Sequence, residues 1–326
     1  MQIGGTARFV TEVHSAEDVR TIVANSRKEG VPFYILGGGS NVIAPDGRYN
    51  GIVIRNCIMG YEEIAEDKDT VTVKLGAGEV WDDFVKRVTR ENLIGVEALS
   101  AIPGTCGAAP VQNIGAYGQE ISDTLTELEA FDTQTDEIVT LSNDDCQFRY
   151  RNSIFRTEEQ GRYIILTVTM RLYKGSPMPP FYSVLENHLK EKNITEYTAT
   201  NIREAVIEIR ANRLPNPAEK PNAGSFFKNS MVDKWLVDDL LQKYPDMPHF
   251  DMGGRIYKVP TGWLIEQCGL KGKLLHGIRV NPANALVLIN ESARGYSDLA
   301  QAREAISKAV SEKFHIHIEQ EPLELA

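Results

Sequence analysis

The chain has 326 residues, of which 42% are hydrophobic and 25% are charged, and it contains 26 glycines and 15 prolines. This composition is typical of a folded protein of two or three domains, and it excludes collagen-like and disordered chains. The formal net charge of −10 disfavours nucleic acid and anionic lipid surfaces as partners.

The four cysteines are dispersed and form no CxxC pair, which predicts neither a zinc site nor a disulfide framework. The N-terminal sequence MQIGGTARFV lacks the basic and apolar regions of a signal peptide. No run of about 18 apolar residues is present, so no membrane span is expected. We therefore expect a cytoplasmic protein with reduced thiols.

The first half of the chain alternates short strands and helices. Ser15 and Asp18 have the spacing of a capping box before an amphipathic helix over residues 19–26, and Gly30 ends this helix. A second helix is expected over residues 79–91. Strands are expected at residues 7–13, 33–36, 51–54, 71–75, 125–131, 137–141 and 163–172.

A segment rich in Pro, Gly and Ser, residues 174–180, marks a domain boundary, and polar sequence continues to residue 200. Prolines 215 and 217 end the helix that begins after this stretch. Helices are expected at residues 202–213, 231–244, 263–268 and 298–311, and strands at 284–290 and 314–318.

A first glycine-rich loop, in the sequence YILGGGSN, follows directly after a strand. Residues without a Cβ allow successive N–H groups to form a concave nest that suits a diphosphate. Ser40 and Asn41 add side-chain donors. No helix follows, which excludes the Rossmann arrangement. A plain tight turn is an equally good interpretation of this loop alone.

A second loop, IPGTCGAAPVQNIGAYG over residues 102–118, is rich in small residues along its whole length. This pattern indicates that something approaches the backbone closely along a line. Two such loops suit an extended dinucleotide, and a packed glycine crossover is the alternative. The residues that we single out are Gly104, Gly107, Ala108, Ala109, Asn113, Gly115, Ala116, Tyr117 and Gly118.

These two loops, together with FRYRNSIF at 148–155 and NAGSFFKN at 222–229, resemble the type I UDP-N-acetylenolpyruvoylglucosamine reductase family in order and spacing across nearly the whole chain. The resemblance implies an α+β protein with the vanillyl-alcohol-oxidase-type (PCMH-type) FAD-binding fold. The implied domains are two FAD-binding subdomains, a linker with a substrate loop, and a substrate-binding domain, at residues 1–56, 57–174, 175–204 and 205–326.

The resemblance also implies a function. It predicts non-covalent FAD, NADPH as co-substrate, and reduction of UDP-N-acetylglucosamine enolpyruvate to UDP-N-acetylmuramate. This reaction belongs to peptidoglycan precursor synthesis and hence to cell shape, the cell cycle and cell division. The implied FAD-binding residues are Gly37, Gly38, Gly39, Ser40, Asn41 and those singled out in the second loop up to Tyr117. We expect a monomer with no nucleic-acid or membrane partner.

Arg151 lies in a segment with apolar neighbours, where a guanidinium needs an anionic partner. That partner is either a structural carboxylate or the planar carboxylate of a substrate. By resemblance, Arg151 holds the enolpyruvyl carboxylate and Tyr150 lies in the same pocket, while Ser225 donates a proton to carbon. Spacing alone is more typical of a turn or an N-cap at Ser225.

The C-terminal glutamates 319 and 321 point to the same face and also fit a solvated acidic tail. By resemblance, Glu321 is the catalytic carboxylate that pairs with Arg151. The family usually has Pro between its two glutamates, whereas this chain has Gln320, so Glu319 stays open as the alternative.

Further substrate contacts are implied for Tyr182, Arg213, Asn229 and Asn284, with Lys228 as an additional candidate. Tyr182 falls in a stretch that resembles the mobile loop that closes over the substrate. No histidine lies in either glycine loop, which disfavours covalent flavin attachment. His315 and His317 alternate with Ile as in ordinary strand packing, and no metal site is expected.

The implied mechanism passes a hydride from NADPH to the flavin and then to the terminal carbon of the enol ether. Arg151 and Glu321 stabilise the developing charge, and Ser225 protonates the adjacent carbon. Two alternatives remain: another FAD-dependent oxidase or dehydrogenase of the same fold, and a non-catalytic nucleotide-binding regulator.

Overall fold

The structure is a computed structural model that describes residues 1–325. The chain forms two compact units, and each is assembled from segments distant in sequence. Unit 1 contains Met1–Thr6, Asn41–Tyr49 and the chain from Ala211 onward; unit 2 contains Ala7–Ser40 and Asn50–Arg210. The expected segments are continuous, so their limits do not coincide with these units, and their functional assignment stays a prediction.

Unit 2 contains a small sheet with the strand order β1-β4-β2, in which β2 and β4 run parallel. The strands are β1 (Thr6–Val13), β2 (Phe33–Leu36) and β4 (Arg48–Asn56). Helix α1 (Ala16–Glu29) has the predicted cap, because the hydroxyl of Ser15 accepts the N–H of Asp18 at 3.1 Å, but it begins before the predicted range 19–26 and extends beyond it. Gly30, at φ 62°, ends it.

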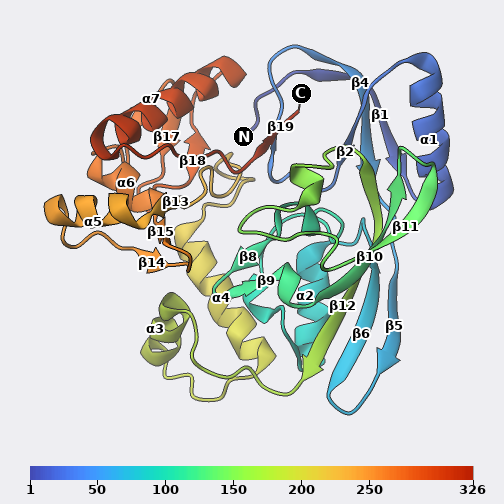
Figure 1. The fold of residues 1–326 in the computed structure, drawn as a ribbon, viewed down its shortest axis with the longest axis horizontal. Coiled ribbons are helices and arrows are strands. Elements are labelled where there is room, and N and C mark those ends of the chain that lie inside the picture. Colours follow the sequence, from blue (N-terminus) through green and yellow to red (C-terminus); the bar gives the residue numbers. More distant parts are fainter. Residues whose placement is uncertain (326) are drawn as a thin grey trace. The chain divides into compact units, whose positions relative to one another are not determined.

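The larger sheet of unit 2 has six strands in the order β11-β10-β12-β6-β5, with β7 paired to β12. Adjacent strands in it are antiparallel. Helix α2 (Trp81–Arg90) packs an apolar face that includes Phe84 and Val88 into the core beneath this sheet (Figure 1). The strands are β5 (Tyr61–Glu66), β6 (Thr70–Gly76), β7 (Leu93–Ile94), β10 (Leu125–Asp132), β11 (Glu137–Ser142) and β12 (Tyr163–Lys174).

Helix α3 (Ser183–Glu191) and helix α4 (Ala199–Arg213), which belongs to unit 2 as far as Arg210, pack against each other through a separate apolar cluster that includes Leu185 and Val206. The second glycine-rich loop contains the short strand β8 (Gly115–Ala116), which pairs with β9 (Gln119–Glu120). Four 3₁₀ turns lie at Glu97–Leu99, Pro110–Gln112, Ile121–Asp123 and Ile154–Arg156.

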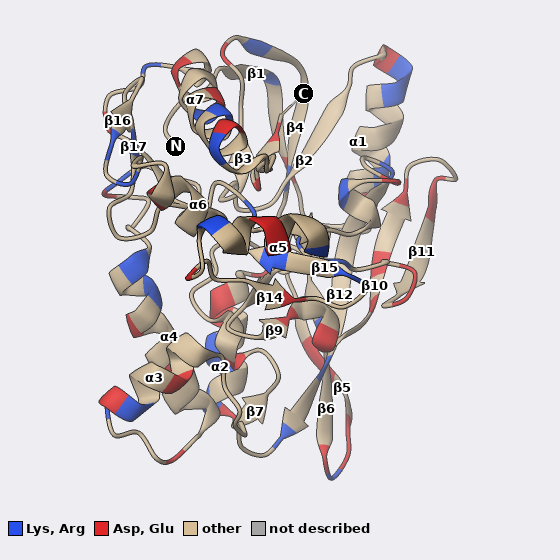
Figure 2. Cartoon of the chain, turned by 60° about the vertical axis from the view of Figure 1, so that its left-hand side comes forward, with Lys and Arg blue, Asp and Glu red and all other residues tan. Residues whose placement is uncertain are grey.

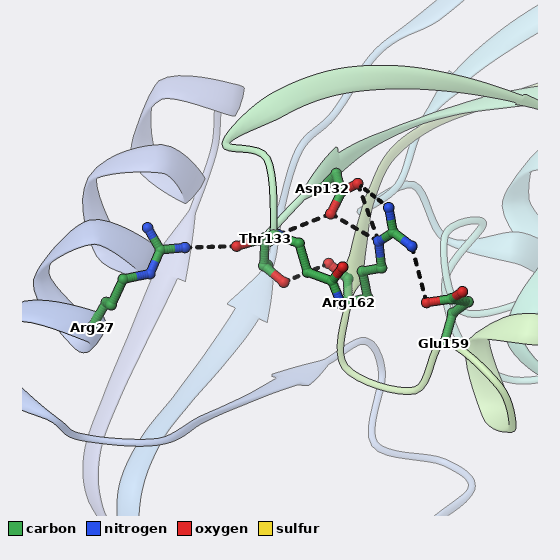
Figure 3. Close-up of polar contacts among 6 residues, drawn as sticks. Arg27, Asp132, Thr133, Glu159 and Arg162 are labelled. Atoms are coloured by element: carbon green, nitrogen blue, oxygen red, sulfur yellow. Dashed lines mark hydrogen bonds and ion pairs between the residues drawn. The ribbon is translucent and has the colours of Figure 1, made fainter.

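A polar network fastens α1 to the turn after β10 (Figure 3). Arg27 of α1 donates to the carbonyl of Thr133 at 2.6 Å. Arg162 donates to both carboxylate oxygens of Asp132, at 3.0 and 2.7 Å, although the Asp132 side chain is only 3% exposed. These hydrogen bonds from Arg162 lower the pKa of Asp132.

Unit 1 is built around α7 (Tyr296–Phe314), whose apolar face packs against α6 (Thr261–Gln267) in one core. Its sheets have the orders β13-β15-β14, β16-β17-β18 and β19-β3. The remaining elements are β3 (Val42–Ile43), β13 (Ser230–Asp233), α5 (Lys234–Lys243), β14 (Phe250–Asp251), β15 (Ile256–Val259), β16 (Leu274–Leu275), β17 (Ile278–Val280), β18 (Leu288–Asn290) and β19 (Leu323–Glu324).

Several expected elements differ from those observed. The helix expected at 231–244 begins only at Lys234, because residues 230–233 pair with β15 and tertiary pairing overrides helix propensity. The strand expected at 314–318 is absent: Phe314 ends α7, and His315 at φ 56° reverses the chain direction. Strand β5 and helix α3 were not anticipated, and only residues 288–290 of the expected strand 284–290 pair as a strand.

Acidic and basic residues are interspersed along α5 and α7 (Figure 2). Lys234 pairs with Asp238, and Lys308 lies near Glu312, each at i,i+4 spacing. Within residues 1–325, no helix combines the length and the apolar character needed to cross a bilayer.

Candidate functional site

The two glycine-rich loops lie against each other within unit 2. A Cβ atom on Gly37 would lie 2.7 Å from Oγ1 of Thr105, and one on Gly38 would lie 3.0 Å from Cα of Gly104. Ser40 also donates its hydroxyl to the carbonyl of Pro103 at 3.1 Å. The close approach inferred from the sequence therefore exists, and at positions 37 and 38 the approaching group is the other loop.

This packing leaves backbone donors of the first loop unused. In the part of the chain that the structure describes, the N–H groups of Gly38, Gly39 and Ser40 donate to no protein acceptor. Gly39 has φ 68°, a left-handed conformation that lets consecutive N–H groups converge. Such a nest fits the diphosphate of a dinucleotide like FAD, because anionic oxygens satisfy donors that have no protein partner.

The second loop is fixed to the strand-to-helix connection before α2. Cys106 donates to the carbonyl of Glu79 at 2.8 Å, and Gly107 donates to the carbonyl of Ala77 at 2.9 Å. The side chain of Asn113, which is 1% exposed, donates to Glu120 at 2.7 Å. The N–H of Asn113 also donates to the carbonyl of Pro110 at 3.1 Å, so this residue shapes the loop through both its side chain and its backbone.

Arg151 lies beside the second loop. Its Nη2 donates to the carbonyl of Gly115 at 2.5 Å, and its Nη1 would lie 2.8 Å from a Cβ at that position. The guanidinium carbon is also 5.2 Å from the centre of the Tyr150 ring. Arg149, in contrast, pairs with Glu158 on the surface at 3.1 Å. The structure thus joins Arg151, Tyr150 and the second loop in one cluster of unit 2.

Tyr182 belongs to the same region of unit 2. It lies immediately before α3, and its ring centre is 6.2 Å from that of Tyr117 in an edge-to-face arrangement. A Cβ atom on Gly118, in the second loop, would lie 4.0 Å from the Cβ of Tyr182. Since 43% of Tyr182 remains exposed, its hydroxyl-bearing ring is accessible beside the second loop.

Arg210, near the end of α4, was missed by the sequence reasoning. It makes no hydrogen bond or ion pair with any of residues 1–325, and burial lowers its pKa, although Tyr117 and Asp82 act in the opposite direction. The Arg151 charge lowers this pKa further, so the two guanidinium groups are electrostatic neighbours. The sequence did contain a signal for Arg210: it lies seven residues after Arg203 and therefore on the same face of α4. The guanidinium of Arg203 binds Asp82 at 2.6 and 2.8 Å.

In unit 1, Ser225 lies in the middle of three extended segments. Ser225 forms a β-bridge with Val287, and on the other side the N–H of Glu321 donates to the carbonyl of Phe226 at 2.8 Å. Ser225 is therefore neither a helix N-cap nor far from the C-terminal segment. The structure brings Ser225 and Glu321 onto neighbouring stretches of backbone.

The two C-terminal glutamates have different surroundings. The side chain of Glu319 is 74% exposed and pairs with Lys228 at 3.2 Å. Glu321 is half-buried. A carboxylate that must act away from bulk water is better placed at position 321, because partial burial strengthens its electrostatic interactions.

Three predicted substrate-binding residues also lie in unit 1. The Oδ1 of Asn229 accepts the N–H of Thr261 at 3.2 Å, and the Oδ1 of Asn284 accepts the N–H of Leu286 at 3.1 Å. Within residues 1–325, the Nδ2 groups of both asparagines donate to no protein acceptor, which leaves them available to a ligand. Arg213 is exposed, and its guanidinium likewise has no protein acceptor there.

The predicted set is thus divided between the units. Unit 2 holds Arg151, Tyr150, Tyr182 and loop residues 37–40 and 102–118. Unit 1 holds Ser225, Glu321, Arg213, Asn229, Asn284 and also Asn41, whose carbonyl accepts the N–H of Leu323 at 3.0 Å. Among the described residues, no group of three or more His, Cys, Asp or Glu side chains is arranged to hold a metal ion.

Comparison with known proteins extends this description. A family model described as FAD binding domain matches residues 7–142, and one described as UDP-N-acetylenolpyruvoylglucosamine reductase, C-terminal domain, matches residues 216–324. A crystal structure of the reductase from Thermus caldophilus superposes with a TM-score of 0.65 at 20% identity, over 97% of this chain and 91% of that one. The expected α+β fold with a vanillyl-alcohol-oxidase-type FAD-binding domain is confirmed.

Curated relatives match over almost the full length. The UDP-N-acetylenolpyruvoylglucosamine reductase of Bdellovibrio bacteriovorus is 42% identical over 99% of this chain and 95% of its own length. The enzyme of the same name from Ralstonia nicotianae is 38% identical over 97% of this chain and 93% of its own length. The chain therefore belongs to the UDP-N-acetylenolpyruvoylglucosamine reductase family.

Proposed function

We propose that this chain is an FAD-dependent reductase that uses NADPH to convert UDP-N-acetylglucosamine enolpyruvate to UDP-N-acetylmuramate, a step of peptidoglycan precursor synthesis. The observation that carries this proposal is the 42% identity with a reductase of that name over 99% of the chain, because the match includes both units. The activity takes place in the cytoplasm, in a monomer, and through cell-wall synthesis it serves cell shape and division.

FAD binds non-covalently to unit 2. The unused N–H groups of Gly38, Gly39 and Ser40 receive the diphosphate, and the second loop lines the same site. When bound, FAD supplies the transfer of a hydride from NADPH to the terminal carbon of the enol ether.

The substrate carboxylate binds to Arg151. Because the Nη2 of this residue is held by the carbonyl of Gly115, the guanidinium is oriented before substrate arrives. Arg210 adds a second cation that makes no hydrogen bond or ion pair within residues 1–325, and together the two guanidinium groups favour negative charge at this place. Tyr182, Arg213, Asn229 and Asn284 contact the rest of the UDP-sugar.

The proton needed at the second carbon comes from the hydroxyl of Ser225. Addition of hydride to the terminal carbon leaves an electron pair on the carbon next to the carboxylate, and that carbon takes the hydroxyl proton. Glu321, half-buried on the neighbouring segment, lies opposite Phe226 and acts beside Ser225 as a hydrogen-bonding partner of the reacting group. The hydroxyl recovers its proton from solvent after product leaves.

An anaerobic absorbance experiment tests the proposal. The purified protein should be yellow, and NADPH should bleach its flavin absorbance band. One equivalent of UDP-N-acetylglucosamine enolpyruvate per flavin should then restore the band. A protein that binds nucleotide but shows no bleaching is a regulator. A protein whose reduced flavin responds to dioxygen but not to the enolpyruvyl sugar is an oxidase of the same fold. Either result refutes the assignment.

A further inference from the structure

The C-terminal segment that carries Glu321 is held by side chains of α7. Arg303 donates its Nη1 to the Oε1 of Gln320 at 2.7 Å and also pairs with the carboxylate of Glu324. Tyr296, two turns earlier on the same helix face, donates its hydroxyl to Glu324 at 2.7 Å. We call Tyr296, Arg303, Gln320 and Glu324 the C-terminal clamp; they come from α7 and from the segment around β19 (Figure 1).

The clamp is partly shielded from water, which strengthens it. The side chains of Arg303 and Glu324 are 31% and 33% exposed. Burial alone would raise the pKa of Glu324, but hydrogen bonds from Tyr296 and Arg303 outweigh this effect and the pKa is lowered. The carboxylate therefore stays ionised and the clamp closed at neutral pH.

Backbone hydrogen bonds hold the same segment at alternate residues. The N–H of Glu321 donates to the carbonyl of Phe226 at 2.8 Å, and that of Leu323 donates to the carbonyl of Asn41 at 3.0 Å. The Nε2 of Gln320 also donates to the carbonyl of Pro322 at 2.8 Å. The clamp thus acts on the residue before Glu321 and on the third residue after it, while the backbone is bonded between them.

We propose that Arg303 is a positioning residue for Glu321: by joining Gln320 to Glu324 it sets where the Glu321 carboxylate lies with respect to Ser225. The proposal rests on the function proposed above. Arg303 is not among the residues predicted to bind FAD or substrate, and its hydrogen bonds go to Gln320 and Glu324. Loss of the clamp leaves the backbone ladder intact, but a displacement of about 1 Å at a reacting group slows chemistry by about 100-fold.

The test separates the two half-reactions in flavin-loaded protein. Arg303→Gln should slow reoxidation of the flavin by UDP-N-acetylglucosamine enolpyruvate by about 10- to 100-fold, whereas reduction by NADPH should stay within about twofold of wild type. Arg303→Lys keeps the charge and should recover part of the rate, and Tyr296→Phe, which removes one hydrogen bond, should have the smallest effect. Lys308→Gln, an exposed residue of the same helix, is the matched control and should change neither rate.

The outcomes are distinct. A clamp that serves only stability would lower the melting temperature of Arg303→Gln and leave both rates per bound flavin unchanged, which would overturn the proposal. Equal slowing of both half-reactions would also overturn it. If Arg303→Gln does not fold, the two milder variants decide. Reoxidation rates that fall in the order wild type, Tyr296→Phe, Arg303→Lys support the proposal, and equal rates overturn it. If wild type itself is not reoxidised by the sugar, the proposed function fails, independently of the clamp.

Discussion

Replacement of Gly38 by Ala tests the contact between the glycine-rich loops. The added Cβ would lie 3.0, 3.6 and 3.7 Å from the Cα, C and N atoms of Gly104. Carbon atoms prefer separations of about 3.5–4.0 Å, and all three neighbours are backbone atoms that cannot rotate away. The loops must therefore separate by about 0.5–1 Å, and overpacking of this kind costs about 1–3 kcal/mol.

We expect that strain to weaken the binding of FAD. The N–H groups of residues 38–40 belong to the displaced loop, and about 1.4 kcal/mol corresponds to a tenfold change in Kd. The Kd for FAD should therefore rise about 5- to 100-fold, measured by quenching of flavin fluorescence on titration into apoprotein. Gly161→Ala is the matched control, because its added Cβ would meet no atom within 4 Å and therefore would not push the loops apart, while its φ of 81° still disfavours any residue with a side chain. That variant should lose stability and keep wild-type FAD affinity.

A Gly38→Ala protein with wild-type FAD affinity would refute this reasoning. It would mean that the loops separate without moving the N–H groups that receive the diphosphate. A loss of affinity in both variants would point to general destabilisation and would refute it equally.

Three further predictions concern single side chains. Ser225→Ala should leave flavin reduction by NADPH fast and slow reoxidation by the enolpyruvyl sugar by at least about 100-fold, in stopped-flow absorbance; equal losses in both steps would count against Ser225 as the acid. Arg151→Ala should lower kcat/KM for the sugar by about 100-fold or more while the purified protein stays yellow, and a flavin-free variant would contradict this role. Asp132→Asn should lower the free energy of unfolding by about 2 kcal/mol at pH 7 in urea melts, because a carboxylate 3% exposed loses its charged bonds from Arg162. Because the folded-state pKa of Asp132 is lowered, this contribution is present above the unfolded-state pKa of about 4 and is lost as the pH falls through the folded value. The difference between variant and wild type should therefore shrink below about pH 4, and a difference independent of pH would assign the effect to packing.

Local patterns with strong periodicity were predictable. Strand β2 has the predicted bounds, 33–36, and α1 has the predicted cap at Ser15, because both signals are contained in adjacent residues. The two glycine loops were also found from composition alone. Their contact was not, because the pairing of Gly38 with Gly104 depends on tertiary packing that no local pattern encodes.

Other features depend on burial or on distant partners. Residues 231–233 were expected to be helical, yet they belong to β13 because β15 supplies the hydrogen bonds. Arg210 resembles a surface residue of an amphipathic helix, and its burial without a hydrogen bond or ion pair within residues 1–325 becomes visible only in the structure. The resemblance favoured Glu321 over Glu319, and the structure adds a difference in exposure that two glutamates of the same strand-like pattern do not reveal. The roles of these residues stay predictions.

The parallel pair of β3 and β19 has a consequence for how the polypeptide acquires its structure. Val42 is synthesised long before its partner Leu323, because the two residues lie far apart in the sequence. Ile43, 2% exposed, fills the same core as α7, so a fragment that begins at residue 211 lacks part of its own interior. Unit 1 is therefore expected to complete its core only after residue 323 has been synthesised, and chaperone dependence should be greatest in nascent chains stalled before that residue.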